Sequence, residues 1–128
     1  MKTKLSYLYA QKSKIEAQIT AEKNRIIDII VNIILLRNKL TMYELMNNKN
    51  IQSIQFCRHE IHYILHLLFC KKKNVDENLL FKMTLKEIGE VTVKGHANIL
   101  NSLKAIENMM YFNKKYKENF TNFIKTLV

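Results

Sequence analysis

Apolar side chains recur over roughly the first forty residues at alternating spacings of four and three, the period of one face of an α-helix. The positions are Leu5, Leu8, Ile15, Ile19, Ile26, Ile29, Ile33, Leu36, Leu40 and Tyr43. Lys12 and Glu22 interrupt this stripe, and further isoleucines widen it from Ile26 onward. We therefore expect residues 1–25 to form an exposed helical extension and residues 26–128 to form a domain whose core includes the widened stripe.

Other local patterns also predict helices. Asn47, Asn48 and Asn50 predict a loop, because Asn favours turns over helix interiors. Thr84 and Glu87 have the spacing of a capping box, which predicts a short helix that begins at Thr84. Apolar periodicity predicts three longer helices, over about 51–70, about 97–109 and about 116–127. With two Gly and no Pro in 128 residues, the chain lacks the turns of a sheet protein, and an all-α fold is predicted.

The chain is strongly basic. Its 21 Lys and Arg residues against 11 Asp and Glu residues give a formal net charge of +10. Residues 1–50 hold nine basic and four acidic residues, and residues 51–128 hold twelve and seven, so each part carries +5. A charge spread over the whole fold favours an anionic partner such as nucleic acid.

Several kinds of protein are disfavoured. The longest apolar stretch, over 26–36, is interrupted by polar residues and too short to span a bilayer, so we expect a cytoplasmic protein without a membrane partner. A phosphate-binding Gly-rich loop ending in Gly-Lys-Ser/Thr is missing from the sequence, which argues against a bound nucleotide. Neighbouring carboxylates at Asp76–Glu77 and Glu87/Glu90 have no nucleophile beside them, so we expect neither an enzyme nor a cofactor.

The cysteines and histidines of the second long helix have simple interpretations. Cys57 and Cys70 lie about 20 Å apart at ~1.5 Å per helical residue, so both are expected to be reduced thiols. His62, His66 and Cys70 share one helical face, with His59 one turn before them, but their spacing matches no established metal motif. We expect packing contacts and no metal site.

A short capped helix followed by a tight turn and a longer helix is the arrangement of a helix-turn-helix. Residues 85–90 (LKEIGE) and 94–107 (KGHANILNSLKAIE) resemble the C-terminal DNA-binding domain of the bacterial replication initiator DnaA. Residues 40–46, Cys57-Arg58 and 118–127 are also similar to that family, so the resemblance spans about 26–128. It implies a Trp-repressor-like helix-turn-helix bundle that binds double-stranded DNA, without the ATPase module of the family.

The resemblance also implies the DNA-binding residues. Lys94 and His96 match the Arg and His of the family's recognition turn, whereas Gly95 stands at its base-reading Asp and Asn98 at one of its Thr residues. The family's Arg-rich loop corresponds to a segment here with Lys49 as its one basic residue. Free amides at a helix N-terminus attract phosphate, and Asn pairs well with adenine. The predicted DNA-binding residues are Lys94, Gly95, His96, Asn98, Arg58, Lys49 and Lys104.

We therefore expect a double-stranded DNA-binding protein that acts as a replication accessory or a transcriptional regulator, and the missing ATPase is compatible with a phage or mobile-element origin. The alternative is a helical scaffold protein that keeps the fold but has lost sequence-specific DNA reading. The N-terminal helix has two interpretations that the sequence leaves open. It either folds over the domain or forms a coiled coil that makes a homodimer.

Overall fold

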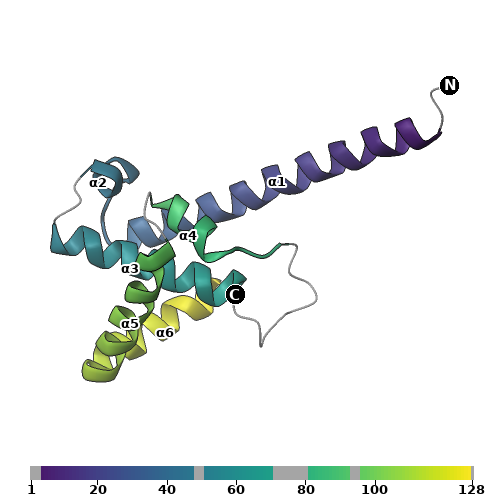
Figure 1. Cartoon of the computed structure of the whole chain (residues 1–128). Coiled ribbons are helices and arrows are strands. Elements are labelled where there is room, and N and C mark those ends of the chain that lie inside the picture. Colours follow the sequence, from purple (N-terminus) through teal and green to yellow (C-terminus); the bar gives the residue numbers. More distant parts are fainter. Residues whose placement is uncertain (1–3, 48–50, 71–80, 93–95, 128) are drawn as a thin grey trace.

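The computed structural model describes residues 4–47, 51–70, 81–92 and 96–127. Every regular element in these ranges is an α-helix, which confirms the predicted all-α fold. The helices are α1 (Lys4–Arg37), α2 (Met42–Asn47), α3 (Gln52–Phe69), α4 (Leu85–Val91), α5 (His96–Phe112) and α6 (Lys114–Leu127), as labelled in Figure 1.

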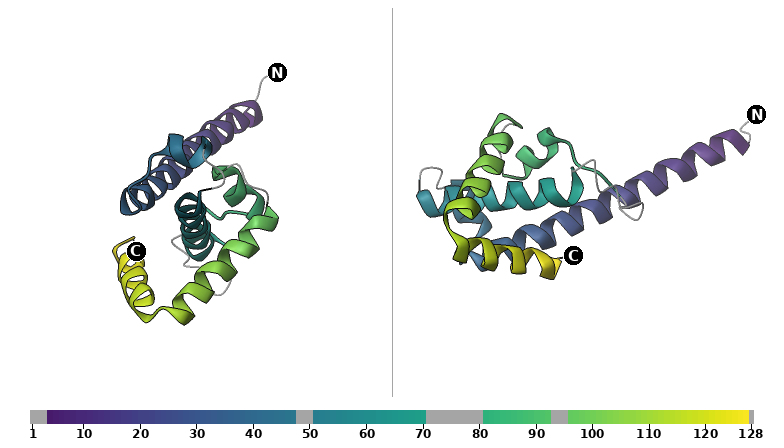
Figure 2. Two further views of the ribbon diagram at one scale, coloured as in Figure 1. Left: turned by 90° about the vertical axis from the view of Figure 1, so that its left-hand side faces the viewer. Right: turned by 90° about the horizontal axis from the view of Figure 1, so that it is seen from below.

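Helix α3 lies at the centre of the domain. It packs against α1, α2, α4 and α5, and α5 also packs against α4 and α6. Ile61, Ile64 and Leu65 of α3 are fully buried, together with Ile99 of α5 and Phe120 of α6. Two views in Figure 2 show the other helices arranged around α3, with the first half of α1 projecting away from the domain.

The first helix is shorter than its apolar pattern suggests. The stripe continues through Leu40 and Tyr43, but α1 ends at Arg37 and α2 is a separate short helix. Lys39 adopts a left-handed conformation with φ 57°, and the Leu40 amide donates to the Leu35 carbonyl at 2.9 Å, as in a Schellman motif. The prediction of one helix through Tyr43 is therefore wrong, because a local C-terminal cap overrides the periodicity.

Thr41, the residue before α2, forms a second capping box. Its hydroxyl accepts from the Glu44 amide at 3.2 Å, and a Glu44 carboxylate oxygen accepts from the Thr41 amide at 3.2 Å. A cap at the end of one helix and a cap at the start of the next thus turn the chain within residues 38–41.

The second half of α1 has two apolar faces. Ile27, Ile30, Val31, Ile34 and Leu35 are buried against the domain. The positions of alternating spacing from Leu5 to Leu36, which we call the heptad stripe, follow a different face of the helix. Its later members Ile29, Ile33 and Leu36 are 45%, 36% and 76% exposed. The expectation that these three residues belong to the core is wrong, because the additional isoleucines supply the core instead.

A buried carboxylate joins three helices. Glu60 of α3 is almost fully buried and accepts from the Asn38 side-chain amide at 2.8 Å and from the Tyr116 hydroxyl at 2.7 Å. The Arg37 guanidinium approaches it at 3.5 Å and lies over the Phe123 ring, 4.8 Å from its centroid. Burial and the hydrogen bond to Glu60 raise the pKa of Tyr116. This network attaches α1 and α6 to α3.

Candidate nucleic-acid interface

The start of α4 is held by the predicted capping box. The Thr84 hydroxyl accepts from the Glu87 amide at 3.1 Å, and the Glu87 carboxylate accepts from the Thr84 amide at 3.1 Å. Lys23 of α1 donates to the other Glu87 oxygen at 2.5 Å, and its ammonium lies over the Phe81 ring. The hydrogen bond from Lys23 is the main reason why the pKa of Glu87 is lowered. These contacts attach α4 to the long first helix.

A chain of hydrogen bonds fixes α4 and α5 to α3. The Ser102 hydroxyl of α5 lies 2.7 Å from the Nδ1 atoms of both His59 and His62 of α3. The Nε2 atom of His62 lies 2.5 Å from the hydroxyl of Thr92, the C-cap residue of α4, and Thr92 donates to the Gly89 carbonyl at 3.5 Å. A chain of hydrogen bonds therefore joins α4 and α5, the two helices of the predicted helix-turn-helix, to α3.

The number of protons on these groups indicates which atom donates and which accepts in each hydrogen bond. A hydroxyl has one proton, so Ser102 can donate to only one of the two imidazoles and must accept from the other. For a neutral His62 ring, the bond from Thr92 to the Gly89 carbonyl makes Nε2 the donor to Thr92 and Nδ1 the acceptor from Ser102. His59 in turn donates to Ser102 through Nδ1. With neutral rings, this assignment gives each of these hydrogen bonds one donor and one acceptor.

Helix α5 carries exposed polar side chains beside this anchor. Ile99, Ser102 and Ile106 are buried, whereas Asn98, Asn101 and Lys104 are exposed. The exposed asparagines border a groove of about 220 Å³ that runs between α3 and α5. The residues that line it are Gln55, Arg58, His59, His62, Asn98, Asn101 and Ser102.

His59 contributes a neutral ring to this groove. It is half-buried, and burial together with the charge of Arg58 lowers its pKa below the ordinary value of 6.5. At neutral pH the groove therefore offers hydrogen-bonding groups from His59 and the two asparagines, and its cationic side chain is Arg58.

Only some of the predicted DNA-binding residues lie in the described part of the chain. Asn98 and Lys104 are exposed on α5, as contact with a DNA groove would require. Arg58 is only 3% exposed and donates to the Leu45 carbonyl, so its guanidinium holds α2 against α3. Its role as a phosphate contact stays a prediction. The other predicted residues, Lys49, Lys94, Gly95 and the side chain of His96, lie outside the described residues.

The structure adds two residues that the sequence interpretation missed. Asn101 follows Asn98 at a helical spacing of three, so both project from the side of α5 away from Ile99. That spacing was a usable signal. Gln55 of α3 borders the same groove, and its proximity to α5 depends on tertiary packing.

Within the described ranges, no three His, Cys, Asp or Glu side chains are grouped so that they could hold a metal ion. None of the described helices combines the length and apolar character needed to cross a bilayer.

Comparison of the chain with protein-family models, with curated proteins and with solved structures gave no match. The functional proposal therefore rests on the geometry of α3, α4 and α5.

Proposed function

We propose that this protein binds double-stranded DNA by placing the N-terminal half of α5 in the major groove. The supporting observation is the way α5 is held. Buried Ile99 and the Ser102 hydrogen bonds to α3 hold its inner face, while Asn98, Asn101 and Lys104 are exposed. A rigid helix with polar side chains at one end is the arrangement that helix-turn-helix proteins use to read base edges.

The side chains have distinct roles in this proposal. Asn98 and Asn101 carry amides that can donate to and accept from the N7 and N6 atoms of adenine. Lys104, about one turn further along α5, supplies a phosphate contact that positions the helix but carries no sequence information. The net charge of +10 supplies the long-range attraction to DNA.

One observation favours the alternative of a helical scaffold protein. Arg58, which the DnaA resemblance implies as a DNA contact, is buried and bonded to the Leu45 carbonyl. A protein that has lost DNA reading would keep such a structural arginine. The two functions differ in what the exposed face of α5 does.

Fluorescence-anisotropy titration of labelled duplexes, AT-rich and random, at several salt concentrations tests the proposal. Four to six phosphate contacts should give a slope of log K against log salt of roughly −4 to −5. The Asn98→Ala and Asn101→Ala variants should each lose about 1 to 3 kcal/mol on the preferred duplex. Lys104→Ala should weaken binding to all duplexes and reduce the slope by about 1.

Matched controls lie on α6, away from the groove. Asn122 and Lys117 are exposed there, so Asn122→Ala and Lys117→Ala repeat the same chemical changes elsewhere on the surface. Both should change affinity by no more than a screened surface group does. Equal losses in test and control variants would mean that diffuse charge holds the DNA, and the scaffold function would replace the proposed one.

A further inference from the structure

Apart from Ile26, which packs partly buried against the domain core, the apolar positions of the heptad stripe remain exposed along α1. Leu5 and Leu8 are 58% and 59% exposed in the half that projects from the domain (Figure 1), and Ile15 and Ile19 are about half exposed. The stripe is still exposed at Ile29, on the part of α1 whose other face packs on the domain. At ~1.5 Å per residue, α1 extends for about 51 Å.

An exposed apolar stripe of this kind is expected to pack against another helix. Helices in water are marginal without tertiary packing of an apolar face, yet no residue from Lys4 to Ala21 is buried by the domain. A strict alternation of four and three residues matches the seam of a coiled coil, in which each apolar side chain packs between side chains of a second helix. A second copy of this chain presents an identical seam.

The two charged positions of the heptad stripe select the orientation. Lys12 occupies an a position and Glu22 a d position of the heptad. Within α1, Lys12 lies 3.9 Å from Glu16 and Glu22 accepts from Arg25, so a pair across the dimer would add to these exposed intrahelical contacts. In a parallel pair, a faces a and d faces d, so Lys12 would meet Lys12 and Glu22 would meet Glu22. In an antiparallel pair, a faces d, and Lys12 can meet Glu22 of the second copy twice.

Setting Lys12 against Glu22 fixes the antiparallel register, and the same register matches the apolar positions. Moving one residue toward the C-terminus in one helix then corresponds to moving one residue toward the N-terminus in the other. The resulting apolar pairs are Leu5 with Ile29, Leu8 with Ile26, and Ile15 with Ile19 of the second copy. One requirement, the pairing of two charges, thus places apolar residues opposite apolar residues along the rest of the overlap.

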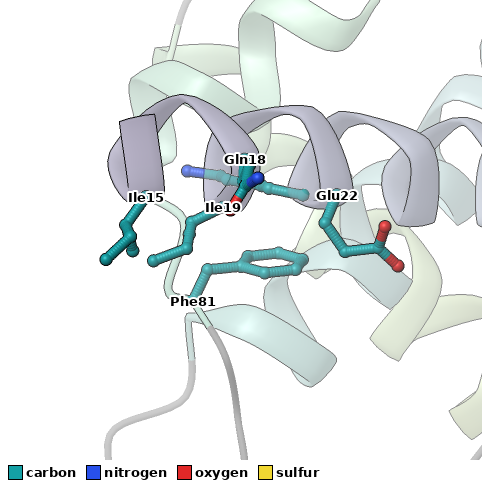
Figure 3. Close-up of a pocket in the computed structure, with 6 residues that line it drawn as sticks. Ile15, Gln18, Ile19, Glu22 and Phe81 are labelled. Atoms are coloured by element: carbon teal, nitrogen blue, oxygen red, sulfur yellow. The ribbon is translucent and has the colours of Figure 1, made fainter. Parts of the chain in front are cut away.

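A groove lies beside the middle of the proposed helix pair. The two-fold axis passes beside Ala17, between Ile15 and Ile19. Figure 3 shows both isoleucines and Phe81 bordering one groove, which has a volume of about 310 Å³. Phe81 forms a wall of that groove, so a second helix would gain an additional apolar contact from the domain.

We propose that two copies of this chain form an antiparallel dimer along α1, with Lys12 of each copy paired to Glu22 of the other. The dimer is independent of the proposed DNA binding, and its test uses no DNA.

Sedimentation equilibrium of the full chain tests the dimer and its register. The wild-type protein should sediment as a dimer at micromolar concentration. Lys12→Glu and Glu22→Lys should each weaken dimerisation at least tenfold, because each creates two like-charge contacts. The double variant Lys12→Glu/Glu22→Lys restores opposite charges and should recover the dimer. Lys14→Glu makes the same charge change on an exposed face of α1 away from the stripe and should have little effect.

Each result of this experiment has a clear meaning. A wild-type monomer at tens of micromolar would overturn the proposal. Equal weakening by Lys14→Glu, or failure of the double variant to recover the dimer, would overturn the register. All of these substitutions are at exposed or half-exposed positions of one helix, and circular dichroism checks that they leave the fold intact.

Spin labels test the orientation separately. Ser6→Cys in a Cys70→Ser background places one accessible label on α1, since Cys57 is buried. In the proposed register Ser6 lies opposite Asp28 of the second copy, so the labels should be separated by about 33 Å along the axis at ~1.5 Å per residue. A distance of about 10 to 20 Å would show a parallel dimer, because neighbouring helix axes lie only about 8 to 10 Å apart, and would overturn the proposal.

Discussion

Replacing Ser102 with Ala should destabilise the domain far more than the loss of one oxygen suggests. The Ser102 side chain is 1% exposed, and its hydroxyl contacts Nδ1 of both His59 and His62. Without it, the buried His62 ring loses a partner that water cannot replace, at a cost of about 1 to 3 kcal/mol. The half-buried His59 ring can be rehydrated and loses about 0.5 to 1.5 kcal/mol. The higher helix propensity of Ala returns about 0.5 kcal/mol.

The expected net loss is therefore about 1 to 4 kcal/mol, a large part of a typical domain stability of about 5 to 15 kcal/mol. Urea unfolding followed by circular dichroism measures it, and the melting temperature should fall by about 4 °C per kcal/mol. The control Ser13→Ala makes the same change at an exposed position of α1 and should be neutral or slightly stabilising.

A double-mutant cycle shows whether the hydrogen bonds cause the loss. In a His62→Leu background the Ser102 hydroxyl has lost its buried partner, so Ser102→Ala should cost clearly less there than in the wild-type protein. An equal cost in both backgrounds would refute the argument, as would a wild-type cost below about 0.5 kcal/mol.

Three further predictions follow from other buried groups. Glu60→Ala should lower the free energy of unfolding in urea by about 3 kcal/mol, because it leaves Arg37 without its carboxylate partner. Glu60→Gln should lower it less, and equal losses in the two variants would mean that the charge of Glu60 does not matter. Because the folded-state pKa of His59 is lowered, the unfolded chain binds more protons below about pH 6.5, so stability should fall as pH drops below that value and His59→Asn should flatten the curve. Burial raises the pKa of Cys57 to about 12, so a thiol reagent should modify Cys70 in the native protein and Cys57 only after unfolding; rapid reaction of both would contradict the burial.

Local interactions made much of this fold predictable from the sequence. The capping box at Thr84 and Glu87 involves residues three apart, so it can be identified without knowing the fold, and the structure has it. The α3, α5 and α6 helices follow their apolar periodicities within a few residues. The helix break after Arg37 also has a local signal, the spacing of Thr41 and Glu44, but the apolar stripe continues across it and gave the wrong prediction.

Tertiary packing decided what residue type and spacing leave open. Helix α1 has apolar residues on two faces, and its packing on α3 buries Ile30 and Ile34 and leaves Ile29 exposed. The sequence did not indicate that Arg58 donates to the Leu45 carbonyl, because that contact depends on how α2 packs on α3.

The same holds for the groups that fix the candidate interface. His62, Thr92 and Ser102 are separated by at least ten residues from one another, so nothing in their local sequence joins them. They meet because burying the apolar faces of α3, α4 and α5 brings polar groups inside the protein, where each must find a hydrogen-bond partner among the residues that packing places beside it. Periodicity indicates which face of a helix is apolar, but the residues that pack against that face are determined by the fold of the whole chain.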